Sequence, residues 1–175
     1  MIRILTDSAS DLTATDSARP GVYTVPLSVT FADGTGGLDG VELTADEFYA
    51  HLKVDKVPPR TSQPSPASFI ELFEEAADAG DEVIVITIAQ KLSGTYQCAS
   101  LAAAETDATV YIIDSETATQ GEAIIVREAI RLREQGLSAS RIAAVLETFK
   151  KRVRVVAIVD SLKHLQKGGR LPAAV

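Results

Sequence analysis

Four short apolar runs rich in β-branched residues are spaced along the chain, at residues 2–5, 83–88, 110–113 and 153–159. Runs this short and apolar on both faces are typical of strands buried inside a parallel sheet. A fifth candidate, residues 22–31, contains Pro26, which favours an edge position or an irregular strand because proline donates no backbone hydrogen bond. The chain therefore supplies several strands of a sheet that needs cover on both sides.

Amphipathic helical patterns lie between these runs, and they supply that cover. Gly80 and Gly136 are plausible helix stops, and Ser138 or Ser140 can cap the last long helix. The predicted helices are residues 66–79, 93–105, 118–135 and 138–150, with a short one at 162–166. Because strand and helix alternate, the sequence predicts an α/β fold, a parallel-sheet α/β/α sandwich.

The amino-acid composition disfavours some classes of binding partner. The chain of 175 residues is 46% hydrophobic and has a net charge of −7, which disfavours nucleic acid and anionic membranes as partners. No apolar stretch is long enough for a signal peptide or a membrane span, so we expect a cytoplasmic protein with no stable membrane insertion. The only dense basic run is Lys150, Lys151, Arg152 and Arg154. We interpret it as a solvated helix end that leads into a strand.

Polar pairs follow three of the predicted strands. They are Asp7-Ser8, Asp114-Ser115 and Asp160-Ser161. In a parallel sheet these loops share one edge, where open α/β folds bind their ligands. Each pair alone is predicted to be a helix cap, because Asp and Ser are favoured there. Three pairs together favour a polar ligand-binding rim.

Two further segments carry hydroxyl groups. Ser93-Gly94-Thr95 opens a predicted helix, where backbone N–H groups, hydroxyls and the helix dipole attract a carboxylate or a phosphate. Residues 61–66, Thr-Ser-Gln-Pro-Ser-Pro, form a proline-stiffened loop. Ser65 as a cap and Pro66 in the first helical turn explain part of this loop structurally, so ligand binding and capping both stay open for it.

Catalytic and metal motifs are missing from the sequence. Ser93 lacks the preceding glycine of a nucleophile elbow, because Lys91 stands there. His51 is predicted to be a surface residue, and His164 has no evident partner. The single cysteine, Cys98, excludes an internal disulfide and a multi-cysteine metal site, and it is interpreted as a small buried thiol. Residues 33–40 are predicted to be a glycine-rich turn rather than a phosphate cradle. No metal and no cofactor are expected.

Six segments, in this order, give the chain its resemblance to a known family. They are TDSASDL (6–12), VPL (25–27), TSQPSP (61–66), LSGTYQ (92–97), VYIIDS (110–115) with Gly121, and LQKGGR (165–170). At these residues the sequence resembles the DegV family of fatty-acid-binding proteins, which includes the FakB carrier subunits of bacterial fatty acid kinase.

The resemblance implies a non-catalytic carrier that buries one long-chain fatty acid, such as palmitate, in an apolar tunnel. It implies that the acyl carboxylate meets Thr61, Ser62 and Ser93, with Gly94 and Thr95 as neighbours. A separate ATP-binding kinase subunit then phosphorylates the carboxylate. Residues expected on a possible rim are Asp7, Ser8, Asp114, Ser115 and Arg170.

The resemblance also implies a division of the chain, with a first α/β domain at residues 1–160 and a truncated start of a second at 161–175. Most of that second domain, which would help to cover the tunnel, is expected to be missing. Two alternatives remain. One is a phosphotransferase-like enzyme acting on a small anionic substrate at the strand ends, although only Asp7, Asp114 and Asp160 could serve it as reactive groups. The other is a regulatory interaction domain with an acidic surface.

Overall fold

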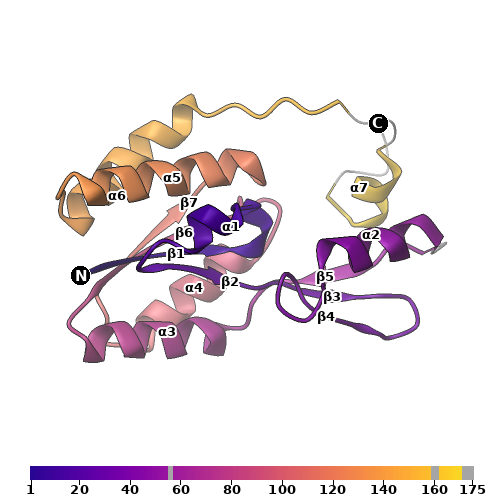
Figure 1. Ribbon diagram of the computed structural model, residues 1–175, viewed down its shortest axis with the longest axis horizontal. Helices are drawn as coiled ribbons and strands as arrows, with labels where there is room; N and C mark the ends of the chain where they lie inside the picture. The colour runs from indigo at the N-terminus through magenta and orange to yellow at the C-terminus, as the bar shows by residue number, and fades with distance from the viewer. Residues whose placement is uncertain (55–56, 159–161, 171–175) are drawn as a thin grey trace. The chain divides into compact units, whose positions relative to one another are not determined.

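The computed structural model describes residues 1–54, 57–158 and 162–170. These residues fall into two compact units, each described by itself below (Figure 1). The first unit comprises Met1–Val25 and Gln63–Val155, and the second comprises Pro26–Ser62 and Val156–Val175.

A four-stranded parallel sheet forms the centre of the first unit, in the order β2-β1-β6-β7. Its strands are β1 (Ile2–Asp7), β2 (Val22–Val25), β6 (Glu82–Thr87) and β7 (Val110–Asp114). In register, Leu5 lies beside Val85, and Val85 lies beside Ile112. The predicted strands at 2–5, 83–88 and 110–113 are therefore confirmed, as is their parallel arrangement.

Helices cover both faces of this sheet (Figure 1). Alternate residues along each strand point to opposite faces. Thus Ile4 and Ile84 pack with the apolar residues of two helices, while Leu5 and Val85 pack with those of two others. The first pair is α5 (Gln120–Glu134) and α6 (Ala139–Phe149), and the second is α3 (Pro66–Asp78) and α4 (Thr95–Ala104). The α/β/α sandwich predicted from the sequence is present.

Helix ends follow the cap residues of the sequence. Ser65 accepts a hydrogen bond from the Ser68 amide ahead of Pro66, and Ser138, rather than Ser140, caps α6 by accepting from the Arg141 amide. Gly80 and Gly136 follow α3 and α5 with positive φ. The shorter elements of this unit are α1 (Ala14–Ser17), a 3-10 turn η1 (Ser8–Ser10) and a second 3-10 turn η2 (Lys150–Arg152).

The second unit holds a small antiparallel sheet in the order β4-β3-β5. Its elements are β3 (Ser28–Thr30), β4 (Gly36–Leu38), α2 (Ala45–Val54), β5 (Arg60–Ser62) and α7 (Lys163–Lys167). The predicted glycine-rich turn is the β3–β4 hairpin, where a Cβ on Gly36 would clash with the Val29 carbonyl oxygen. His51 is not a free surface residue, because its half-buried ring stacks on Phe31 with centroids 3.8 Å apart.

Three predictions about secondary structure are wrong. The run 22–31 is two strands in two sheets, because the chain leaves the parallel sheet at Pro26. Thr61 and Ser62 belong to strand β5 rather than to a loop. Residues 153–158 form no strand, and Val156 and Ile158 are 91% and 100% exposed, because no described strand pairs with them. Val159 lies outside the described residues, as do Asp160 and Ser161.

Lys150 also departs from its predicted role as a solvated residue. It is 8% exposed, and its Nζ donates to the Asp114 carbonyl at 2.9 Å. Nζ also pairs with Glu147 at 2.8 Å and with Glu116 at 3.2 Å. The ammonium group therefore joins the end of α6 to the end of β7. Lys151, Arg152 and Arg154 are exposed, as predicted.

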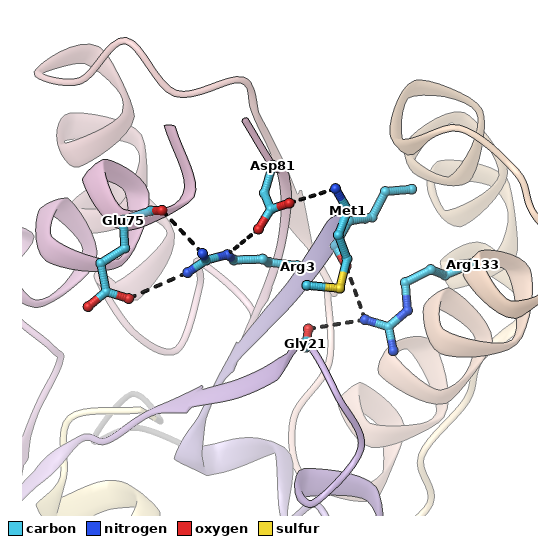
Figure 2. A network of polar contacts seen from close by, with 7 residues as sticks. Met1, Arg3, Gly21, Glu75, Asp81 and Arg133 are labelled. Carbon is cyan, nitrogen blue, oxygen red and sulfur yellow. Dashed lines mark hydrogen bonds and ion pairs between the residues drawn. The ribbon is translucent and has the colours of Figure 1, made fainter. Parts of the chain in front are cut away.

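Two arginines fasten the amino-terminal edge of the sheet (Figure 2). Arg3 donates to Asp81 at 2.9 Å and to the Glu75 carbonyl at 3.1 Å, and Asp81 also pairs with the Met1 amino group. On the other side, Arg133 Nη1 donates to the carbonyl oxygens of Ile2 at 3.0 Å and Gly21 at 3.1 Å. Arg133 thus ties α5 to the starts of β1 and β2.

Replacing Arg133 by Met should lower the free energy of unfolding by about 1–3 kcal/mol, because two half-buried carbonyl groups lose a charged donor. Urea denaturation followed by circular dichroism measures this. Arg131→Met is the matched control, since Arg131 is exposed and its hydrogen-bond partner, Glu128, lies on the same helix. The control should leave the midpoint unchanged. Equal midpoints for wild type and Arg133→Met would contradict the assignment.

Candidate functional site

The carboxyl ends of the three longer parallel strands meet, as the sequence predicts, at one edge of the first unit. Asp7 Oδ2, at the end of β1, accepts from the Ile88 amide beyond β6 at 2.8 Å. Ser115, beyond β7, donates its amide to the Thr87 carbonyl at 3.1 Å. The loops after the strands are therefore held together by hydrogen bonds between polar groups of different strands.

Asp7 is buried in this edge, with 1% of its surface exposed. Its Oδ1 accepts from the Ala9 amide at 3.1 Å, so it is the N-cap of η1. Burial raises the pKa of Asp7 to about 6, although the two amide hydrogen bonds to Ile88 and Ala9 oppose the shift. Asp7 thus has the structural role that the capping interpretation predicts for it.

The other rim candidates lie in the same loops or in the second unit. Asp114 Oδ1 accepts from the amides of Gln90 at 3.2 Å and Glu116 at 3.0 Å. Ser115 is buried and bonds Thr117, while Ser8 is half-buried. Arg170 is exposed beyond α7. Asp114 and Ser115 therefore brace backbone groups, and a ligand-binding role for these residues stays a prediction.

The predicted carboxylate-binding residues are distributed over both units. Thr61 and Ser62 are exposed on β5 of the second unit, where they pair in register with Val29 and Ser28. Ser93, Gly94 and Thr95 open α4 in the first unit. The site built from both segments stays a prediction.

The start of α4 has an unusual arrangement of polar groups. Gly94 is the N-cap, and no side chain of the described residues caps this helix. Ser93 therefore is not the cap; its hydroxyl lies 2.9 Å from the hydroxyl of Thr95, which is fully buried. Amides of a first helical turn that lack a side-chain acceptor carry a partial positive charge. Two hydroxyls beside such a turn can donate to an anion.

Glu122 is a buried acid that the sequence analysis did not single out. It is fully buried in α5, and its Oε1 accepts from the Thr6 hydroxyl at 2.9 Å. Its Oε2 has no hydrogen-bond partner among the described residues. Burial first, and then the negative charge of Asp7, raise its pKa from 4.5 to about 10. Its burial could have been predicted from the helical spacing in the sequence, because Glu122 lies on the same apolar helix face as Ile125 and Ala129.

The buried carboxyls predict a loss of stability as the pH rises. Folded Glu122 keeps its proton up to about pH 10, while the unfolded carboxyl releases it near 4.5, so unfolding becomes easier between those values. Asp7 acts with the same sign between 3.8 and about 6. Glu122→Gln should be more stable than wild type at pH 8, by at least about 1 kcal/mol, with a smaller difference at pH 5.

Urea denaturation at a series of pH values measures this difference. Glu134→Gln is the control, because Glu134 is exposed on the same helix. It should retain the pH dependence of the wild type. A Glu122→Gln variant whose stability follows the wild type at every pH would show that the carboxyl ionises without cost in the folded protein.

Among residues 1–54, 57–158 and 162–170, no cluster of three or more His, Cys, Asp or Glu side chains could hold a metal ion. Within those ranges no helix is both long and apolar enough to cross a bilayer.

The doubly covered parallel sheet, with hydroxyls beside an uncapped helix at its carboxyl edge, defines an α/β protein of the kind that binds ligands at strand ends. The family follows from comparison with known proteins. The chain belongs to the DegV family, whose model, described as "Uncharacterised protein, DegV family", matches residues 1–175. The resemblance found in the sequence is thereby confirmed.

Relatives of this chain include a DegV domain-containing protein of Caldanaerobacter subterraneus, 37% identical over 97% of this chain and 60% of that protein. The solved structure of a fatty-acid-binding DegV protein from Thermus thermophilus is 35% identical over 96% of this chain and 60% of that one, with a TM-score of 0.84. A stearic-acid-binding protein from Eubacterium ventriosum is 33% identical, covers 84% of this chain and 52% of that one, and has a TM-score of 0.78.

These two solved relatives are described as binding proteins and not as enzymes. The high TM-scores agree with the α/β/α fold. The chain spans 60% of the length of the Caldanaerobacter and Thermus proteins.

Proposed function

We propose that this chain is a non-catalytic binding and carrier protein for a long-chain fatty acid, such as palmitate. The observation that carries the proposal is the pair of hydroxyls, Ser93 and Thr95, at the uncapped start of α4. It occurs in a chain whose relatives from Thermus thermophilus and Eubacterium ventriosum bind fatty acids. Thr61, Ser62 and Ser93 bind the carboxylate in this proposal, with Gly94 and Thr95 beside them.

The chemistry of the α4 start suits a carboxylate. The hydroxyl that donates within this pair can turn its proton to an incoming oxygen, and the amides of the first turn supply further donors. Hydrogen bonds to a charged acceptor are about twice as strong as neutral ones. Arg170 and the strand-end residues Asp7, Ser8, Asp114 and Ser115 form the rim of the site in this proposal.

The finer parts of the proposal concern partners and organisation. The carboxylate is presented to the ATP-binding subunit of a fatty acid kinase in the cytoplasm. Residues 1–160 are the first domain, and 161–175 begin a second one. Residues 156 and 158 support this, since exposed apolar side chains on an extended segment favour packing against further protein.

The alternative of a phosphotransferase-like enzyme finds less support. Asp7 has a raised pKa of about 6, as a general base would, but it is 1% exposed and both carboxylate oxygens already accept backbone hydrogen bonds. Asp114 likewise accepts two amides. Burial and the backbone hydrogen bonds to both oxygens keep Asp7 away from a substrate proton, and backbone amides occupy Oδ1 of Asp114.

Palmitate binding tests the proposed function directly. Burying 16 carbons at about 0.8 kcal/mol per methylene yields on the order of 12 kcal/mol, far more than a few hydrogen bonds to the carboxylate. Because this chain spans 60% of the Thermus thermophilus protein, it should bind palmitate much more weakly than that relative, and it should self-associate. Calorimetry on both proteins measures the difference. Absence of any palmitate binding would contradict the proposal, and equal affinities would show that this chain supplies the whole tunnel.

The Ser93 hydroxyl should contribute a charge-assisted hydrogen bond of about 1.5–3 kcal/mol. Ser93→Ala should therefore weaken fatty-acid binding about tenfold or more, with an unchanged melting temperature. Displacement of the fluorescent fatty acid cis-parinarate by palmitate measures the affinity. Ser140→Ala, in an exposed position on α6, is the control. Unchanged affinity in Ser93→Ala would exclude Ser93 as a carboxylate ligand.

A further inference from the structure

We propose that Gln63 is a positioning residue of the carboxylate site, holding the start of α4 in the conformation that receives the ligand. This inference rests on the proposed function and adds to it a residue that does not itself bind the carboxylate. Two contacts within the first unit carry it, one to Gly94 and one to Cys98. Both lie in or beside the first turn of α4.

The first contact is the close approach of the Gln63 amide to Gly94. A Cβ built on Gly94 would lie 2.7 Å from Gln63 Nε2 and 3.0 Å from Gln63 Cδ and Oε1. The backbone of Gly94 itself, with φ −79° and ψ 8°, is open to other residues. A larger residue at this position would therefore push the Gln63 amide away from the helix start, while the backbone conformation of Gly94 would tolerate it.

The second contact is a hydrogen bond in which Gln63 Nε2 donates to the sulfur of Cys98 at 3.6 Å. Cys98 lies one turn further along α4, where its own amide donates to the Gly94 carbonyl at 3.0 Å. The side chain of Gln63 therefore spans the N-cap and the first turn of the helix. It fixes Gly94 against the turn whose amides face the proposed ligand.

The neighbours of these residues in the sequence give the contact its functional meaning. Gln63 directly follows Ser62 in the chain, and Gly94 directly follows Ser93. Each of the two contacting residues is therefore the chain neighbour of a residue proposed to bind the carboxylate. A hydroxyl held in place before the ligand arrives loses less conformational entropy on binding. Gln63 thereby raises fatty-acid affinity without touching the carboxylate.

Four variants separate this role from a general effect on folding: Gln63→Ala, Gly94→Ala, their combination, and Gln97→Ala as the matched control. Gln97 is exposed on α4 itself. Each single change at 63 or 94 should weaken cis-parinarate binding by about three- to tenfold. The double variant should be no weaker than the worse single variant, because truncation of Gln63 removes the atoms with which the methyl group added at position 94 would clash. Gln97→Ala should bind as the wild type does.

A second measurement reports on the contact without any ligand. Cys98 is the only cysteine of the chain and is buried, so its rate of reaction with Ellman's reagent follows the opening of this part of α4. Gln63→Ala should react faster than wild type, while Gln97→Ala should not. If Gln63→Ala fails to fold, Gln63→Met keeps about the same side-chain length and removes the amide group. It should show the same two changes, but smaller ones.

The outcomes are distinct. Wild-type affinity and wild-type thiol reactivity in Gln63→Ala or Gln63→Met would overturn the positioning role. Additive losses in the double variant would overturn the steric argument about Gly94. The proposed function would be contradicted if the wild-type protein bound neither cis-parinarate nor palmitate. If Gln63→Ala still made Cys98 react faster, the contact between Gln63 and α4 would stand without that function.

Discussion

The pairing of β1 with β6 at the centre of the parallel sheet is the constraint on which the first unit depends. Both strands are flanked by strands and covered by helices, so every side chain between Ile4 and Thr6 is buried. Along the strands, apolar side chains can be buried without losing hydrogen bonds. At the carboxyl edge, polar groups can be buried only if they form hydrogen bonds between loops, such as that from the Ile88 amide to Asp7. This explains why Asp7 and Asp114 of the predicted rim are engaged with backbone amides.

Buried carboxyls beside this edge have a consequence for stability. Glu122 and Asp7 both have raised pKa values because burial disfavours their charged forms, and the negative charge of Asp7 raises that of Glu122 further. Burial and the repulsion between two negative charges disfavour the state in which both carboxyls are ionised. The buried ammonium group of Lys150, by contrast, stays charged because it is paired with Glu147 and Glu116 and donates to the Asp114 carbonyl.

Most of the first unit could be predicted from the sequence, because its signals are local. Apolar runs such as residues 83–88 can be satisfied only inside a sheet, and Ser65, Gly80 and Gly136 mark helix ends through their own hydrogen bonding or backbone freedom. The run at 153–158 has the same composition but no strand beside it among the described residues, so composition alone misled the prediction there. At residues 22–31 Pro26 predicted an edge position or an irregular strand, because a proline alone does not show that the chain passes into a second sheet.

The sequence by itself determined the alternation of strands and helices, the family and the hydroxyl-bearing segments, because each depends on residue types at short spacing. Only the tertiary structure decided that Asp7 also accepts the Ile88 amide, that Glu122 is buried beside it, and that Gln63 covers Gly94. The hydrogen bonds of these side chains to other elements join residues 35 to 116 positions apart, and nothing in a local pattern specifies which distant side chain fills a given space. The division of the proposed carboxylate-binding segments between two compact units has the same origin, since it depends on long-range packing rather than on local propensity.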